Sequence, residues 1–210
     1  MYFCGGSIIS EDWIMTAAHC MDDAGFVEVV AGAHDLTVNE DSQVSMTSTD
    51  FFIHEDYSST LIHNDIAMIQ LPSSLTFNDY IQPVCLPSGS DLGVGVDVTP
   101  TGWGKDHDGI GSTTDTLNQV TVPTISNDEC ADYYGSLIVN DDMICIDAAG
   151  GMGTCSEFGG PHELPDWWNH PKSENRIFFR LIAGCEQEHQ TLSQESTLLG
   201  DPRQHPVLLI

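Results

Sequence analysis

The sequence predicts an all-β protein, built either as one large β unit or as two small barrels. The chain has 210 residues, 40% of them hydrophobic, which is enough to bury a substantial core. Short apolar or alternating runs recur between turn residues, at the spacing typical of barrels and sandwiches. Helical periodicity is sparse, so we expect few and short helices.

Five segments carry the strand pattern. They are FVEVVAG (26–32), QVSMTST (43–49), DIAMIQL (65–71), LNQVTVP (117–123) and DMICI (142–146). A single helical turn fits residues 16–19, and Ser126 followed by Glu129 forms a capping box that predicts a short helix up to Tyr134. Residues 187–206 lack a clear period and predict a loop or a disordered segment.

The charge of the chain excludes several classes of function. It has 32 acidic residues against five basic ones, for a formal net charge of −27. Such a chain repels phosphate backbones and anionic lipid surfaces, so we exclude nucleic acids as partners. No apolar run reaches the roughly 18 to 20 residues that span a bilayer, which argues against a membrane protein. We interpret the charge as the solvated surface of a soluble monomer.

The cysteines indicate the compartment. The chain has seven, none of them in a C-x-x-C pair, which favours disulfides in an oxidising compartment over metal sites. Secretion is therefore predicted. No signal-peptide pattern precedes Cys4, so we expect the chain to begin inside a longer protein. His34, His54 and His63 lie on acidic, polar stretches without ligand spacing, and we expect neither a metal nor a cofactor.

A compositional boundary falls at Pro161. Residues 1–161 contain one basic residue, Lys105, against 25 acidic ones, whereas residues 162–210 contain the other four basic residues against seven acidic ones. The two segments look like products of different selection. One hypothesis is an altered reading frame or a mis-joined exon near Cys155, which makes 162–210 a divergent tail.

Two residues are candidates for acyl-transfer catalysis. This chemistry needs a base with a near-neutral pKa, a carboxylate that orients the base, and donors for the oxyanion. His19 lies in the segment TAAHC, and Asp65 follows 46 residues later at the head of an apolar strand. Taken singly, His19 also fits a structural histidine and Asp65 an ordinary strand cap. Together, the pair is predicted to be a catalytic base and its carboxylate.

Four segments in this order resemble the chymotrypsin and trypsin family over about residues 2–161. They are TAAHC, NDIAMIQL, IQPVCLP and PTGWG. TAAHCMDDAGFVEVVAGAHDL and STDFFIHEDY look most like arthropod digestive chymotrypsins and the related brachyurins, which cleave collagen. The resemblance implies a double β-barrel, with barrel one at about 1–90 and barrel two from about 91, incomplete after Pro161.

The same resemblance implies a secreted digestive serine endopeptidase that acts on proteins or peptides and is bound by protease inhibitors. His19 would be the general base, and Asp65 the buried carboxylate that holds it. No cofactor is implied. The resemblance also implies that the first strand and the mature N-terminus of the family are missing from residues 1–161 and would lie upstream of Met1.

The family's nucleophile element breaks the pattern. It reads Cys-x-Gly-Asp-Ser-Gly-Gly-Pro, whereas this chain reads Cys-Ser-Glu-Phe-Gly-Gly-Pro at 155–161. Aligned on Gly-Gly-Pro, the oxyanion glycine is missing, Glu157 replaces the aspartate, and Phe158 stands where the serine should be. Ser156 is two positions away on a shortened loop. We therefore expect the chain to be inactive as written.

Two alternatives remain open at this point. The first is a non-catalytic protease homologue that keeps the fold as a binding or regulatory module. The second is a truncated gene product without a selected function.

By similarity, two disulfides are expected, Cys4–Cys20 and Cys130–Cys145. If RIFFRLIAGC (176–185) supplies a strand, a third would join Cys155 to Cys185. Cys85 is then left over, either as a free buried thiol or as a partner for a missing propeptide.

Gly153 would form the base of the specificity pocket, where trypsins have an aspartate. A preference for Arg or Lys side chains is therefore disfavoured, and large apolar or mixed side chains fit better.

Overall fold

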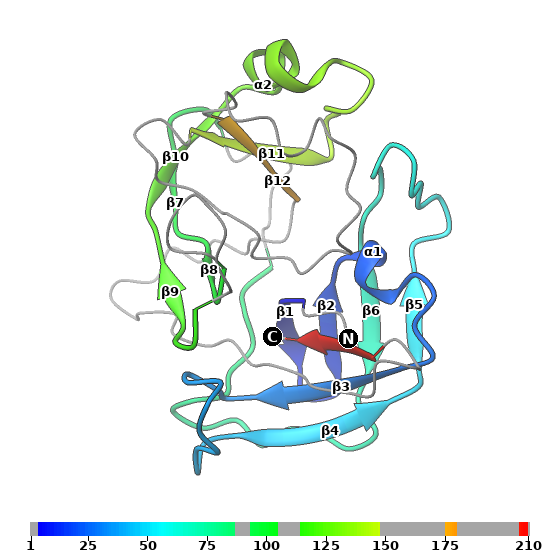
Figure 1. Ribbon diagram of the computed structural model, residues 1–210, viewed down its shortest axis with the longest axis vertical. Coiled ribbons are helices and arrows are strands. Elements are labelled where there is room, and N and C mark those ends of the chain that lie inside the picture. The colour runs from blue at the N-terminus through cyan, green and yellow to red at the C-terminus, as the bar shows by residue number, and fades with distance from the viewer. Residues whose placement is uncertain (1–3, 87–92, 105–113, 148–174, 180–205, 210) are drawn as a thin grey trace.

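The computed structural model describes residues 4–86, 93–104 and 114–147, together with the backbone of residues 175–179 and 206–209. This part of the chain is mostly strands with two short helices, which confirms the all-β prediction. In Figure 1 the strands form a lower and an upper unit. The strands of the lower unit are β1 (Gly6–Ser10), β2 (Trp13–Thr16), β3 (Phe26–Ala31), β4 (Val44–Ser48), β5 (Phe51–Ile53), β6 (Ala67–Gln70) and β13 (Pro206–Leu209).

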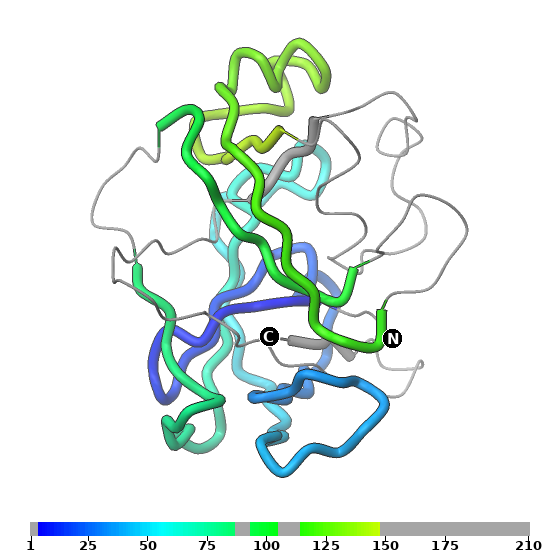
Figure 2. The backbone as a smooth tube through the Cα atoms, turned by 90° about the vertical axis from the view of Figure 1, so that its left-hand side faces the viewer, coloured from blue at the N-terminus to red at the C-terminus, as the bar shows by residue number. Residues whose placement is uncertain are grey.

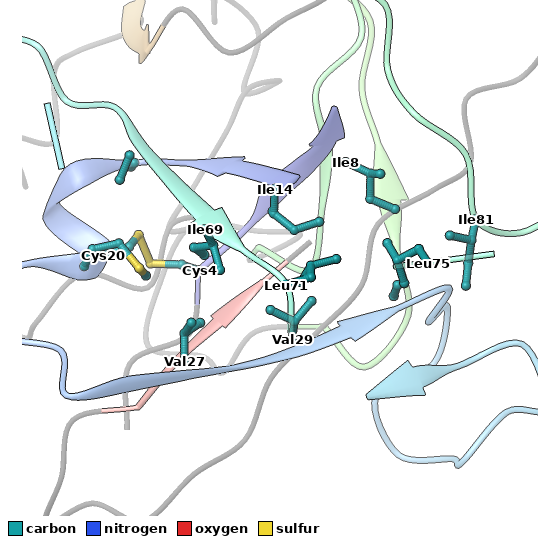
Figure 3. Close-up of a cluster of buried hydrophobic side chains, with 14 residues drawn as sticks. Cys4, Ile8, Ile14, Cys20, Val27, Val29, Ile69, Leu71, Leu75 and Ile81 are labelled. Atoms are coloured by element: carbon teal, nitrogen blue, oxygen red, sulfur yellow. A yellow bond between two sulfur atoms is a disulfide. The ribbon is translucent and has the colours of Figure 1, made fainter. Parts of the chain in front are cut away.

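The lower unit contains two sheets, with strand orders β1-β2-β6-β5 and β13-β3-β4. Every pair in these sheets is antiparallel except β13 with β3, which is parallel. Strict alternation in β3 puts Val27, Val29 and Ala31 in the core with 0% exposure, as expected for a strand with one buried face. Figure 3 shows Val27 pointing toward Ile69 and the Cys4–Cys20 disulfide, and Val29 pointing toward Leu71.

The upper unit has a four-stranded sheet of order β12-β11-β10-β7 and the two-stranded ladder β8-β9. Its elements are β7 (Asp97–Val98), β8 (Thr101–Gly102), β9 (Asn118–Gln119), β10 (Val122–Ile125), α2 (Asn127–Tyr134), β11 (Met143–Asp147) and β12 (Asn175–Phe179). The predicted helix start is present, with Ser126 as the N-cap: the Glu129 N–H donates to Ser126 Oγ at 3.1 Å. Two small clusters of buried residues lie in this unit, around Cys130 and Val122.

Hydrogen bonds join the two units at one side. The Trp103 indole N–H donates to the His34 carbonyl at 3.0 Å, and the Leu36 N–H donates to the Asp115 carbonyl at 2.8 Å. In Figure 2 the green chain of the upper unit runs down to meet the blue segments of the lower one. Within the described residues the sheets of neither unit close into a complete barrel.

Most predicted elements are present, with changes at their ends. Residues 117–123 form two strands instead of one, because the chain leaves β8 after Gln119 and pairs with β7 from Val122. The candidate strand at 176–185 is present in its first part as β12, which pairs with β11 over five residues. Pro206, placed in the loop of 187–206, instead begins strand β13; the rest of that loop lies outside the described residues.

The turn after β3 depends on glycine. Gly32 has φ +81°, a conformation that residues with a side chain rarely adopt. A Cβ at this position would collide with the Ser42 carbonyl oxygen. The turn is also fixed by Ser42 Oγ, which donates to the Gly32 carbonyl at 2.7 Å.

Candidate active site

The register of β2 and β6 brings His19 and Asp65 together. Thr16, the last residue of β2, lies opposite Ala67, the first residue of β6. The chain after Thr16 and the chain before Ala67 therefore lie at the same end of the sheet. His19 lies in the short helix α1 (Ala18–Met21), three residues after β2, and Asp65 lies two residues before β6.

Asp65 holds His19 through both carboxylate oxygens. The backbone N–H of His19 donates to Oδ1 at 2.7 Å, and ring atom Nδ1 lies 2.6 Å from Oδ2. The Asp65 side chain is 0% exposed, whereas the His19 side chain is 20% exposed. Because a carboxylate only accepts, Nδ1 carries the proton and Nε2 is left as the basic atom. This is the geometry of a general base oriented by a buried carboxylate.

The loop before Asp65 has a strained backbone. Ile62 has φ +53° and Asn64 has φ +52°, and such values are outliers for a β-branched residue like Ile62. Hydrogen bonds hold the loop in this shape, since the Ser58 N–H donates to His63 O at 3.0 Å and the Ile66 N–H donates to Asn64 O at 2.8 Å. Strain of this kind costs about 1–3 kcal/mol per residue and is concentrated at functional sites.

Two further residues contact this region, and sequence reasoning did not find them. His63 Nε2 lies 3.0 Å from the Ile138 carbonyl, which joins the loop before Asp65 to the upper unit. Tyr57 is half-buried, and its pKa is raised by burial and by the negative charges of Asp65 and Asp22. The Tyr57 hydroxyl therefore stays neutral far into the alkaline range. Its place in the HEDY segment, eight residues before Asp65, was the available signal.

Both disulfides expected from the resemblance are present, Cys4–Cys20 in the lower unit and Cys130–Cys145 in the upper unit. The first braces the helix that carries His19, and Cys20 Sγ lies 3.5 Å from His19 Nε2.

Within the described residues, Cys4, His19 and Cys20 are the one group with metal-ligand spacing. The two sulfurs are bonded to each other, so this group does not offer a set of thiolate ligands.

The expectation that Cys85 is left over is wrong. Cys85 is disulfide-bonded. Spacing along the chain does not determine which cysteines meet, so the error reflects a missing three-dimensional constraint. The other predicted site residues, Gly153, Phe158 and Ser156, and the Cys155–Cys185 pair lie outside the described residues.

A shallow apolar hollow of about 400 Å³ lies elsewhere, on the sheet that contains β1 and β2. It is lined by Ile9, Ser10, Trp13, Phe52 and Met68. None of these is a predicted site residue.

No helix in the described part of the chain is long and apolar enough to cross a membrane.

Comparison with protein families decides the assignment. The family model described as Trypsin matches residues 1–162. The chain belongs to the trypsin family. This trypsin-family chain is 56% identical over 187 residues to brachyurin from Leptuca pugilator, which covers 89% of the chain and 79% of that protein. It is 39% identical over 172 residues to Trypsin-1 from Astacus astacus, and this match covers 79% of the chain and 72% of that protein.

Chymotrypsin from Phaedon cochleariae is 41% identical over 162 residues, covering 75% of this trypsin-family chain and 58% of the relative. The chain is thus a brachyurin-like member of a family of serine endopeptidases, which act on proteins. The match to brachyurin takes in 25 residues more than the 162 of the family model, so similarity continues beyond residue 162.

Proposed function

We propose that this chain derives from a secreted digestive endopeptidase of the brachyurin kind and that the 210-residue form does not hydrolyse peptide bonds. The observation that carries the proposal is the sequence Cys-Ser-Glu-Phe-Gly-Gly-Pro at 155–161, which places Phe158 at the position of the nucleophile. The contact between His19 and Asp65 supports the endopeptidase lineage, because Nδ1 of His19 lies 2.6 Å from Oδ2 of Asp65.

The mechanism of an active relative explains why this combination is inert. His19 Nε2 would take the proton from a serine hydroxyl as its oxygen attacks the scissile carbonyl, and Asp65 would stabilise the imidazolium. Backbone N–H groups at the nucleophile would then bind the oxyanion. Phe158 has no lone pair or proton to offer, and one oxyanion donor is deleted with the glycine. Loss of one triad member alone lowers the rate by about 10⁴- to 10⁶-fold in serine proteases.

The proposal extends to the side-chain preference, the compartment and the partners of the active relative. Gly153 leaves the base of the specificity pocket uncharged, which fits large apolar or mixed side chains rather than Lys or Arg. The disulfides fit an oxidising, extracellular compartment. Substrates of the active relative would be proteins, and protein inhibitors of the family are the partners to test.

A fluorophosphonate probe tests the proposal on the whole chain. The probe phosphonylates an activated serine and releases fluoride, so the intact mass increases by one adduct. We expect no adduct on the 210-residue chain under conditions that fully label an active trypsin-family protease. An adduct that maps to Ser156 and disappears in His19→Ala would contradict the proposal, because it would show an activated hydroxyl.

A second candidate function is a binding or regulatory module without catalysis. Strand β12 favours it, because the sheet of the upper unit continues beyond Pro161 through five residue pairs with β11. A circular-dichroism melt combined with limited proteolysis distinguishes the two. One cooperative transition and protease resistance through residue 210 support the module, whereas early cleavage of residues 162–210 counts against it.

A further inference from the structure

The Cys4–Cys20 disulfide lies directly beside the ring of His19. Cys20 Sγ is 3.5 Å from His19 Nε2, and the ligand atoms of Cys4, His19 and Cys20 all lie within 4.8 Å of one another. Figure 3 shows the disulfide in the core, next to Ile69. The sulfurs are not thiolate ligands as long as they are bonded to each other, but reduction would leave two thiols next to an imidazole.

The spacing of these atoms matches a tetrahedral zinc site. Zn–S bonds are about 2.3 Å long and Zn–N bonds about 2.0–2.1 Å long, so a sulfur and a nitrogen on one tetrahedral ion lie about 3.5 Å apart. The distance from Cys20 Sγ to His19 Nε2 already has this value. Only the two sulfurs must separate, to about 3.8 Å, and rotation about the side-chain bonds of the reduced cysteines supplies this movement.

Asp65 prepares His19 to bind a metal. The ring donates through Nδ1 to Asp65 Oδ2 at 2.6 Å, so the lone pair of the neutral ring lies on Nε2, the atom near Cys20. Histidines that bind metals almost always donate their other ring N–H to a carboxylate, a carbonyl or water, which fixes the ring and raises its basicity. The carboxylate that orients a general base therefore also orients a metal ligand.

The charges of the three side chains favour a divalent ion. Cys4 and Cys20 are 1% and 3% exposed, and thiolates buried to this extent need a compensating positive charge. Two thiolates and a neutral imidazole carry two negative charges together, which one divalent cation neutralises. Sulfur and imidazole ligands favour Zn²⁺ over Mg²⁺ and Ca²⁺, which prefer oxygen.

We propose that Cys4, Cys20 and His19 form a latent Zn²⁺ site, which becomes available when an external dithiol reduces the Cys4–Cys20 disulfide. The dithiol is oxidised to its own disulfide, and its two electrons and two protons pass to Cys4 and Cys20. Zn²⁺ then replaces both thiol protons and binds His19 Nε2, and water takes the fourth position. The bound ion occupies the lone pair that a general base needs, so reduction converts the site of a base into a metal site.

Protection from alkylation tests the site on the full chain. A phosphine reduces the disulfides in place of a dithiol, because a dithiol itself binds zinc; the phosphine becomes its oxide with oxygen from water. After the excess is removed, one equivalent of zinc chloride is added, followed by a pulse of iodoacetamide, whose iodide the thiolates displace. Peptide mass spectrometry then gives the alkylation rate of each cysteine.

We expect Zn²⁺ to slow the alkylation of Cys4 and Cys20 at least about tenfold. Cys130 and Cys145 are the control within the same chain, because they are not in the one group with metal-ligand spacing that the described residues contain. Their rates should stay unchanged. Equal rates with and without Zn²⁺, or equal protection of both pairs, would overturn the proposal.

Cobalt reports on the ligands themselves. Tetrahedral Co²⁺ absorbs visible light, and its bonds to thiolates add a charge-transfer band in the near ultraviolet. We expect these bands in the reduced chain and in His54→Ala, which removes an exposed histidine outside the group, but not in the oxidised chain or in His19→Ala. Asp65→Asn should weaken Co²⁺ binding about 10- to 100-fold. Unchanged bands in His19→Ala would show that the imidazole is not a ligand and would overturn the proposal.

The experiment also decides the matter if the reduced chain unfolds. Metal binding is then coupled to folding, so Zn²⁺ should restore the β-sheet circular-dichroism spectrum of the wild type and of His54→Ala but not of His19→Ala. Failure of Zn²⁺ to restore the wild-type spectrum would contradict the proposal. Equal recovery in His19→Ala would also contradict it, because the metal would then be held without the imidazole.

Discussion

At the scale of single residues, the hydrogen bonds between His19 and Asp65 contribute to stability as well as to the orientation of the His19 ring. The buried carboxylate accepts one bond from the His19 backbone and one from its ring. Asp65→Ala removes both bonds and leaves the partly buried His19 N–H without its acceptor. We expect a loss of about 2–4 kcal/mol in the free energy of unfolding, measured by urea denaturation.

Asp65→Asn is the control that separates stability from orientation. Its amide oxygen can still accept from the His19 N–H, so the stability loss should be smaller than for alanine. Its amide nitrogen would face Nδ1, which forces the ring proton to Nε2. Nitrogen NMR of His19 should therefore report the other tautomer, and an unchanged tautomer would mean that Asp65 does not orient the ring.

Glu40 supplies a prediction about pH. Burial raises the pKa of its carboxyl, but hydrogen bonds from the backbone N–H groups of His34 and Asp35 and from the Gln43 side chain outweigh this, so the pKa lies below its ordinary value of 4.5. The folded protein thus binds the proton more weakly than the unfolded chain. The stability from Glu40 is present above pH 4.5 and is lost as the pH falls through the lowered value.

On going from neutral to acid pH, we expect the stability of the Glu40→Gln variant to decrease less than the stability of the wild type. Denaturation midpoints measured across this range check it. Parallel curves for the two proteins would show that Glu40 makes no pH-dependent contribution.

Some contacts of the candidate site could be predicted from the sequence, and others could not. His19 and Asp65 lie in segments whose composition is distinctive, so their roles could be predicted before their contact was seen. The contact of His63 with Ile138 depends on how the two units pack, and no local pattern carries that information. The disulfide of Cys85 was missed for the same reason.

At the scale of elements, the turn between β3 and β4 is the most sensitive to a small change. Gly32→Ala puts a methyl group against the Ser42 carbonyl and forces a left-handed conformation. We expect a loss of about 2–3 kcal/mol in stability. Gly25→Ala is the matched control, because a Cβ there meets nothing within 4 Å. Similar thermal denaturation midpoints for the two variants would contradict this account.

Strands with clear alternation were predictable, and those whose existence depends on partners were not. β3 and β4 have apolar residues at every second position, and β6 is part of a short apolar run, so the pattern alone indicates them. β7 and β8 have two residues each, too few for any period to show. β13 pairs with a strand 180 residues away, and its four residues say nothing about that partner.

At the scale of the whole molecule, the net charge of −27 opposes the compact state. Raising sodium chloride from about 0.01 M to about 1 M shortens the Debye length from about 30 Å to about 3 Å, which screens this repulsion. We expect the melting temperature to rise by several degrees, as an increase of about 1–2 kcal/mol would give in a chain of this size. A melting temperature that stays constant or falls would mean that attractive pairs offset the repulsion.

The boundary at Pro161 stays a prediction. The composition changes there, yet the match to brachyurin continues beyond residue 162 and β12 joins the sheet of the upper unit. A peptide map of the native protein from Met143 to Cys185 would read the segment directly. Finding Gly-Asp-Ser before Gly-Gly-Pro would mean that the native protein carries the nucleophile, unlike the sequence at 155–161. Finding Ser-Glu-Phe would establish that the nucleophilic serine is lost.

The pairing of β13 with β3 also has a consequence for biosynthesis. A ribosome adds about 5–20 residues per second, so the 180 positions that separate Phe26 from Pro206 take roughly 10–35 s to make. During that time β3 can pair with β4, whereas the residues of β13 have not yet been made. The pairing of β3 with β13 can therefore form only after residues 206–209 have been made, later than every other strand pair described in the lower unit.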